Sequence, residues 1–180
     1  RTVLDSARID GLPVVLIGLS LGGTSAARYA QRYPGDIAAL VLAAPILGTW
    51  PTVDLLGEDT LPDLAVDPDL LSRDPAVAEA WRADPLVFHG AYPRPTLTAI
   101  DEALRTIDFD HPLGDDLPGL WLHGEDDQLA PEAETRTGMD RIRGLNFTEH
   151  IYPGARHEVW HDLNAAEVRA DLLKFLDRIG

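Results

Sequence analysis

The sequence contains no cysteine among its 180 residues. This absence excludes disulfides, thiolate nucleophiles and cysteine-based zinc or iron–sulfur sites, although it does not identify a cellular compartment. Basic residues are also scarce, because 15 lysines and arginines face 30 aspartates and glutamates and leave a formal charge of −15. Such a chain repels phosphate backbones on average, so we expect no nucleic-acid partner. Chemistry in this chain must therefore come from oxygen and imidazole groups.

Long hydrophobic runs are missing as well. No apolar stretch approaches the roughly 18 residues that a membrane span needs, so we expect no span. The composition is otherwise globular, with 45% hydrophobic and 25% charged residues, which excludes collagen, coiled coil and wholesale disorder.

Short apolar runs alternate with helical segments in the first and last parts of the chain. This alternation indicates an α/β fold with a mostly parallel sheet flanked by helices. The final helix is predicted to follow a capping box, since Glu167 stands three residues after Asn164. The expected strands are 14–17, 37–44, 120–122 and 147–152, and the expected helices are 2–9, 25–32, 131–142 and the one after Asn164.

The middle of the chain differs, because prolines recur there, acidic residues cluster and apolar residues are scattered. Asp74-Pro75 offers an N-cap followed by proline at the first helical position, which predicts a helix to about residue 83. A second helix is expected over 96–107. We interpret 46–117 as a helical cap or lid, and an acidic, proline-rich linker is the alternative.

Residues Gly18 to Gly22 fit the pattern G-x-S-x-G between a predicted strand and a predicted helix. Glycines allow the sharp turn that would push the Ser20 hydroxyl out at the carboxyl end of the sheet. The following helix would point its N-terminus, including the N–H of Leu21, at an oxyanion formed there. The alternatives are a turn with an idle serine or a turn that cradles phosphate.

A nucleophilic serine needs a base, and His157 follows the last predicted strand, where a parallel sheet would bring it to the same rim as Ser20. His161 is the nearest rival. The two could be metal ligands on one helical face, but no third ligand is obvious, so we expect no metal. The other histidines are His89 and His111 in the middle segment, His123 at a strand end, and His150.

The base needs a carboxylate to orient it. Glu125, Asp126 and Asp127 compete for this role in the loop after the strand 120–122, and a solvated loop or a weak calcium site is the alternative.

Taken together, these motifs resemble the α/β-hydrolase superfamily, specifically its monoacylglycerol lipase and lysophospholipase-like branch, which also contains serine aminopeptidase-like members. The resemblance rests on the turn at 18–23, on the segments 71–75 and 84–87, and on the loop at 152–158. It implies an α/β-hydrolase fold with an inserted cap, divided into core parts at 1–45 and 118–180 and a cap at 46–117. It implies no cofactor.

Carried over by position, the resemblance makes Ser20 the nucleophile, His157 the base and Asp127 the acid, because the family's acid stands third after the strand's glycine. Asp126 is the rival. The implied reaction is attack on an ester carbonyl, an acyl-enzyme, and release by water.

The implied partner is a small-molecule acyl ester such as a monoacylglycerol. We expect four apolar residues to contact it, although they would equally serve the cap's own packing. A peptidase would instead place Glu58 or Asp59 near the scissile bond, and a non-catalytic binding module is the rival from another class. The expected contacts are Leu19, Ile46, Leu47 and Trp50.

Two features depart from this branch. Leu19 stands where the branch usually has histidine. The family's early strands, with the loop that supplies a second oxyanion donor, are absent from this chain, which would leave the edge of the first strand bare. We therefore expect either a missing amino-terminal segment or another copy, as in a dimer, to cover that edge.

Overall fold

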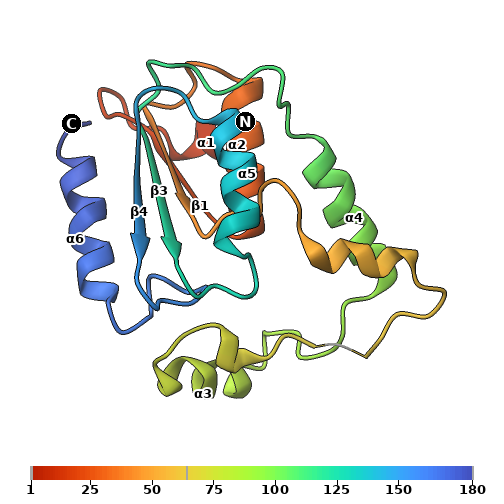
Figure 1. The fold of residues 1–180 in the computed structure, drawn as a ribbon. Coiled ribbons are helices and arrows are strands. Elements are labelled where there is room, and N and C mark those ends of the chain that lie inside the picture. Colours follow the sequence, from red (N-terminus) through yellow and green to blue (C-terminus); the bar gives the residue numbers. More distant parts are fainter. Residues whose placement is uncertain (1, 64, 180) are drawn as a thin grey trace.

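The protein is described by a computed structural model over residues 2–63 and 65–179. Four parallel strands form one sheet in the order β1-β2-β3-β4 (Figure 1). All of the carboxyl ends therefore lie at the same edge, and the expected parallel architecture is confirmed. The strands span Val15–Leu19, Ala39–Ala43, Gly119–Gly124 and Phe147–Tyr152.

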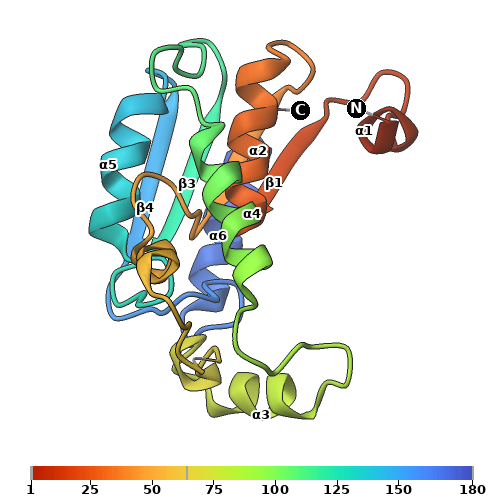
Figure 2. The ribbon, with the colours of Figure 1, turned by 90° about the vertical axis from the view of Figure 1, so that its right-hand side faces the viewer.

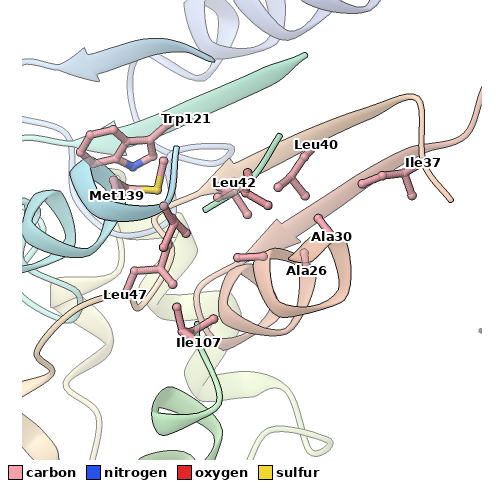
Figure 3. Close-up of a cluster of buried hydrophobic side chains, with 12 residues drawn as sticks. Ala26, Ala30, Ile37, Leu40, Leu42, Leu47, Ile107, Trp121 and Met139 are labelled. Carbon is pink, nitrogen blue, oxygen red and sulfur yellow. The ribbon is translucent and has the colours of Figure 1, made fainter. Parts of the chain in front are cut away.

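Helices cover both faces of this sheet (Figure 1). Helices α2 and α5 lie on one face, where Leu40 and Leu42 of β2 pack with Trp121 and Met139 (Figure 3). Because strand side chains alternate, Val41 instead packs on the opposite face with α6. The helices are α1 (Thr2–Ala7), α2 (Leu21–Arg32), α3 (Pro75–Ala83), α4 (Arg94–Arg105), α5 (Glu132–Ile142) and α6 (Ala165–Leu176), with 3₁₀ turns η1 (Pro51–Gly57) and η2 (Pro68–Leu70).

Helix α2 begins four residues earlier than expected, directly after Ser20. Glycines permit this close packing, since a Cβ on Gly18 would overlap the Gly22 carbonyl and one on Gly23 would overlap Pro45. The glycines that suggested a loop therefore form the start of the helix. Their small size lets β1, α2 and the chain after β2 meet at one point.

The segment between β2 and β3, described over 44–63 and 65–118, is called the insert below. It contains η1, η2, α3 and α4, and its α3 region lies beyond the carboxyl ends of the strands (Figures 1 and 2). Helix α3 has the expected cap, because Asp74 Oδ1 accepts a hydrogen bond from the N–H of Ala76 at 3.0 Å. The insert also forms its own apolar cluster, which includes Trp50, Leu97 and Ile100.

The expected capping box at α6 is wrong. Asn164 does occupy the N-cap position, but its side chain makes no capping hydrogen bond. Its Oδ1 instead accepts a hydrogen bond from Arg73 Nη2 at 2.8 Å. A charged donor from the insert thus outcompetes the local backbone for this side chain.

Strand β1 lies at an edge of the sheet, and its Ile17 is 47% exposed. None of the helices in the described part of the chain is both long and apolar enough to cross a lipid bilayer.

Candidate active site

Ser20 is held in an uncommon backbone conformation between β1 and α2, with φ 55° and ψ −123°. A non-glycine residue with positive φ carries strain that its surroundings must offset. Here the Ser20 N–H donates to the carbonyl of Ala43 at 3.0 Å, and its carbonyl accepts from the N–H groups of Gly23 at 2.9 Å and Ile46 at 3.2 Å. The ends of β1 and β2 therefore fix the position of this serine.

The N–H of Leu21 is available at the same place. Because α2 begins at Leu21, this N–H has no carbonyl four residues back within the helix. The positive end of the helix dipole adds to its attraction for an anion. A negative oxygen beside Ser20 would therefore be stabilised from this side.

His157 and Asp127 are brought together from loops 30 residues apart. His157 Nδ1 lies 2.8 Å from Asp127 Oδ2, and both residues are almost completely buried. Asp127 Oδ1 accepts hydrogen bonds from the N–H groups of Leu129 and Ala130, each at 2.9 Å. The rival Asp126 is exposed, so Asp127 is the one of these two carboxylates that contacts this imidazole.

A second histidine also contacts Asp127. His123 is fully buried, and its Nε2 lies 2.8 Å from the Ala130 carbonyl and 3.3 Å from Asp127 Oδ2. Trp121 Nε1 donates to His123 Nδ1 at 3.1 Å, and because an indole can only donate, His123 carries its proton on Nε2. The position of His123 at a strand end gives no sign of this contact in the sequence, since it requires the loop after β3 to fold back.

These hydrogen bonds determine the charge on Asp127. Burial by itself would raise the pKa of this carboxyl, but the hydrogen bonds from His123 and His157 and the charge of His157 outweigh burial and lower the pKa to about 2. Asp127 is therefore an anion throughout the physiological range. An anionic partner stabilises an imidazolium on His157.

Ser20 and His157 both line a cavity of about 540 Å³ below the insert. Of the expected substrate contacts, Ile46 and Trp50 line it too. Leu47 instead packs in the core between the sheet and α2, and Leu19 packs towards α6 because strand side chains alternate. Most of the wall is apolar and comes from the insert, including Leu55, Leu61, Leu70, Leu71, Trp81, Tyr92 and Leu97.

The polar residues of the wall differ from those expected for a peptidase. Glu58 and Asp59 are exposed and lie outside the cavity wall. The acidic residues that do line the cavity are Asp67 and Glu158. The neutral polar residues Thr52 and Gln128 line it as well.

All six histidines lie within the described residues, and His157 is the one that lines the cavity. His161, the rival base, is mostly exposed beside Glu158. His89 packs against Trp81 in the insert, and His111 pairs with Asp108 on the surface. Within residues 2–63 and 65–179, no group of three acidic or histidine side chains is arranged to hold a metal ion.

Comparison with known proteins gives consistent matches. A family model described as serine aminopeptidase, S33, matches residues 2–164. The monoacylglycerol lipase of Mycolicibacterium smegmatis is 32% identical over an alignment of 191 positions. This alignment covers 98% of this chain and 67% of the relative. Human monoglyceride lipase is 28% identical, with 89% of this chain and 57% of the relative covered.

The crystal structure of Paleococcus ferrophilus monoacylglycerol lipase superimposes with a TM-score of 0.80 at 24% identity, covering 99% of this chain and 72% of the other. At that identity the likeness shows a common fold, which is the α/β-hydrolase fold. The chain spans 57% to 67% of the length of the two curated relatives.

Proposed function

Since this chain belongs to the serine aminopeptidase S33 family of α/β-hydrolases, and to its monoacylglycerol lipase-like branch, we propose that it is a serine carboxylic-ester hydrolase acting through an acyl-enzyme. This proposal rests on one observation. Ser20, Leu21 and His157 line the same cavity, and His157 is hydrogen-bonded to the buried Asp127. A serine, an oriented base and an oxyanion donor are the parts that acyl transfer requires.

The proposed reaction has two halves. Ser20 Oγ attacks the ester carbonyl carbon while His157 Nε2 takes its proton, and the carbonyl oxygen becomes an oxyanion that accepts a hydrogen bond from Leu21 N–H. His157 then gives the proton to the leaving alcohol, and the acyl group remains on Ser20. Water activated by His157 attacks this acyl-enzyme and releases the acid.

The substrate we propose is a neutral ester of a medium or long acyl chain, such as a monoacylglycerol. The apolar wall of the cavity and its volume of about 540 Å³ favour an acyl chain. Apart from the His157 imidazole, the described residues of the wall contribute no charged side chains other than carboxylates. Carboxylates disfavour an anionic substrate. We propose further that 46–117 forms a cap over the core parts 1–45 and 118–180, because the insert supplies most of that wall.

The test is hydrolysis of p-nitrophenyl esters from acetate to palmitate, and of a monoacylglycerol, by the chain and by Ser20→Ala. We expect a chain-length optimum above acetate and loss of activity in Ser20→Ala. Ser25→Ala is the matched control, because Ser25 is an exposed serine on α2, the helix that follows Ser20, and lies outside the cavity wall. Equal activity in wild type and Ser20→Ala would contradict the proposal.

Two rivals are separated by the same preparation. Faster cleavage of aminoacyl p-nitroanilides than of esters would make the chain a peptidase. A fluorophosphonate labels only an activated serine, so absence of Ser20 labelling together with absence of hydrolysis would favour a non-catalytic binding module.

A further inference from the structure

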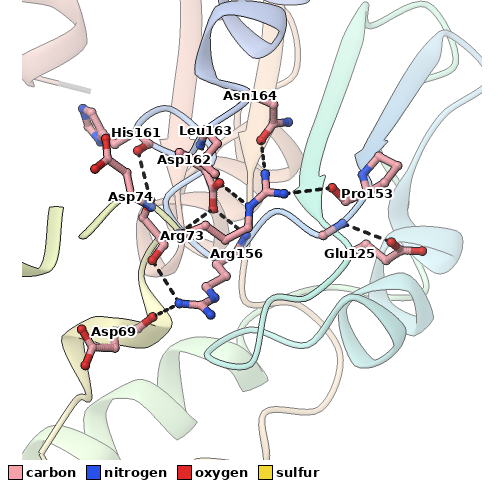
Figure 4. A network of polar contacts seen from close by, with 12 residues as sticks. Asp69, Arg73, Asp74, Glu125, Pro153, Arg156, His161, Asp162, Leu163 and Asn164 are labelled. Atoms are coloured by element: carbon pink, nitrogen blue, oxygen red, sulfur yellow. Dashed lines mark hydrogen bonds and ion pairs between the residues drawn. The ribbon is translucent and has the colours of Figure 1, made fainter. Parts of the chain in front are cut away.

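The loop that carries His157, residues 153–164, is here called the histidine loop. A network of polar contacts joins this loop to the insert (Figure 4). The central acceptor is Asp162, whose side chain is completely buried. Burial by itself would raise the pKa of this carboxyl, but the N–H of Arg156 and the guanidinium of Arg73, among other donors, outweigh burial and lower the pKa. A buried carboxylate of this kind requires a cationic partner.

Arg73 provides that partner from the insert, just before α3. Its Nε donates to Asp162 Oδ1 at 2.6 Å, and its backbone N–H donates to Asp162 Oδ2 at 3.2 Å. The same guanidinium reaches Asn164 Oδ1 at 2.8 Å and the Pro153 carbonyl at 3.5 Å. Arg73 thus contacts both ends of the histidine loop, with His157 between them.

Further hydrogen bonds join the two segments in both directions. Arg156 Nη1 donates to the carbonyls of Asp69 and Ser72, and the Ser72 hydroxyl donates to the His161 carbonyl at 3.1 Å. The N–H of Glu158, next to His157, donates to the Leu71 carbonyl at 2.7 Å. The residues on both sides of His157 are therefore bonded to a short stretch of the insert.

We propose that Arg73 is a positioning residue, which holds the histidine loop through Asp162 so that His157 stays hydrogen-bonded to Asp127 at the cavity that Ser20 also lines. The insert then has a second task besides forming the cavity wall. This inference rests on the proposed function, because the geometry it protects is that of the proposed base. Arg73 touches neither of the proposed reacting groups.

The test compares Arg73→Ala with Arg143→Ala in the full chain. Arg143 is a matched control, because it too is bound by carboxylates, those of Asp140 and Glu149, and is similarly exposed, but it lies at the end of α5 outside the cavity wall. Displacement of a reacting group by about 1 Å can cost about a hundred-fold in rate, so Arg73→Ala should lower kcat roughly ten- to a hundred-fold with a smaller change in KM. Arg143→Ala should leave kcat unchanged.

Two further readouts separate positioning from general loss of stability. Methylguanidinium should restore part of the kcat of Arg73→Ala, whereas sodium chloride at the same ionic strength should not. Arg73→Lys should remain impaired, because one ammonium cannot reach Asp162, Asn164 and Pro153 together. Equal losses of kcat in both alanine variants, or the absence of methylguanidinium rescue, would overturn the proposal.

Amide hydrogen exchange provides a readout that is independent of activity. The N–H groups of Arg156 and Glu158 should lose protection in Arg73→Ala and keep it in Arg143→Ala. Unchanged protection would overturn the inference even if the chain is an esterase. Lost protection in a chain with no hydrolase activity would instead mean that the proposed function fails while the contact between insert and loop is real.

Discussion

The sheet and the insert are held together in different ways. Strands β2 and β3 are buried at every position, whereas η1 and η2 contain no buried residue and α3 buries only Ala78. The centre of the sheet is therefore stabilised by apolar burial along both of these strands. The insert instead depends on its own apolar cluster, on a few side chains such as Leu47 and Ile107 that pack into the core of the sheet, and on polar attachments to the loops of the core.

Those attachments reach the loops of both proposed partners of Ser20. Trp50 Nε1 donates to the Leu129 carbonyl beside Asp127 at 2.8 Å, and Arg73 holds the loop of His157. The sheet and the insert therefore have different tasks. The sheet supplies the proposed reacting groups, while the insert supplies the wall and steadies the loops, so changes in the two regions should have different kinetic signatures.

The largest effect is expected in the core, for Asp127→Asn. The amide cannot stabilise an imidazolium and can leave His157 with the wrong tautomer, so kcat should fall by about 10⁴. The measurement is kcat on the best p-nitrophenyl ester, with Asp126→Asn as the control that should remain near wild type. A similar loss in both variants would mean that the loop, and not the buried carboxylate, matters.

His123→Phe should lower kcat roughly ten- to a hundred-fold, because it removes a hydrogen bond to the charged Asp127 and leaves the N–H of Trp121 without its acceptor. His123→Gln should retain most of the activity, since an amide can both donate and accept. Steady-state kinetics of the two variants provide the measurement. Equal losses would show that shape alone matters at this position.

The low pKa of Asp127, about 2, predicts how the free energy of unfolding depends on pH. Its folded-state pKa lies below its ordinary value of 3.8, so the ion stabilises the fold above that value and the contribution is lost as the pH falls towards 2. The difference in unfolding free energy between wild type and Asp127→Asn should therefore shrink by about 2 kcal/mol on acidification. Urea unfolding at several pH values measures it, and a pH-independent difference would contradict the assignment.

In the insert, Trp50→Ala should reduce kcat/KM for long acyl esters by about ten-fold and change that for acetate less. The physical reason is loss of apolar wall. Trp50→Phe retains a ring but loses the hydrogen bond to Leu129. If Trp50→Phe is as impaired as Trp50→Ala on every ester, Trp50 acts through the acid loop and the division between the regions is weaker than we infer.

The smallest effect is expected for Leu86→Ser, after α3. Leu86 is 93% exposed, so its replacement should change the free energy of unfolding by less than about 0.5 kcal/mol. Leu97→Ala, within the apolar cluster of the insert, is the contrast and should cost about 2–5 kcal/mol. Denaturant unfolding of both variants measures how much each position contributes to stability.

Much of the framework follows from local patterns. The strand at 147–152 and the helix that begins after Asp74 have the expected positions, because alternation of apolar runs and a proline-stabilised N-terminus are local signals. The early start of α2 could not be predicted in this way. Its glycines have low helix propensity, and only close packing explains a helix there: Gly23 lies against Pro45, and Gly18 of β1 lies against Gly22 and Ala26.

Side chains whose partners are distant in sequence were the least predictable. Asn164 follows the local pattern of an N-cap but binds Arg73, which lies 91 residues away. Leu47 has the apolar character of a cavity residue but packs in the core, because the chain turns after β2. A local pattern specifies what a side chain can do, while the neighbours that compete for it come from elsewhere.

Local sequence was sufficient for the parallel sheet, for the glycine turn around Ser20 and for placing the loops of His157 and Asp127 at one edge, since apolar periodicity and the alternation of strands with helices along the chain are local patterns. The family resemblance of the sequence already pointed to Asp127, but the tertiary structure alone buried it against His157 while its neighbours stayed exposed, added His123 to it, and joined Arg73 to the histidine loop. Burial and charge pairing depend on which distant segments meet, and that is decided only when the whole chain folds.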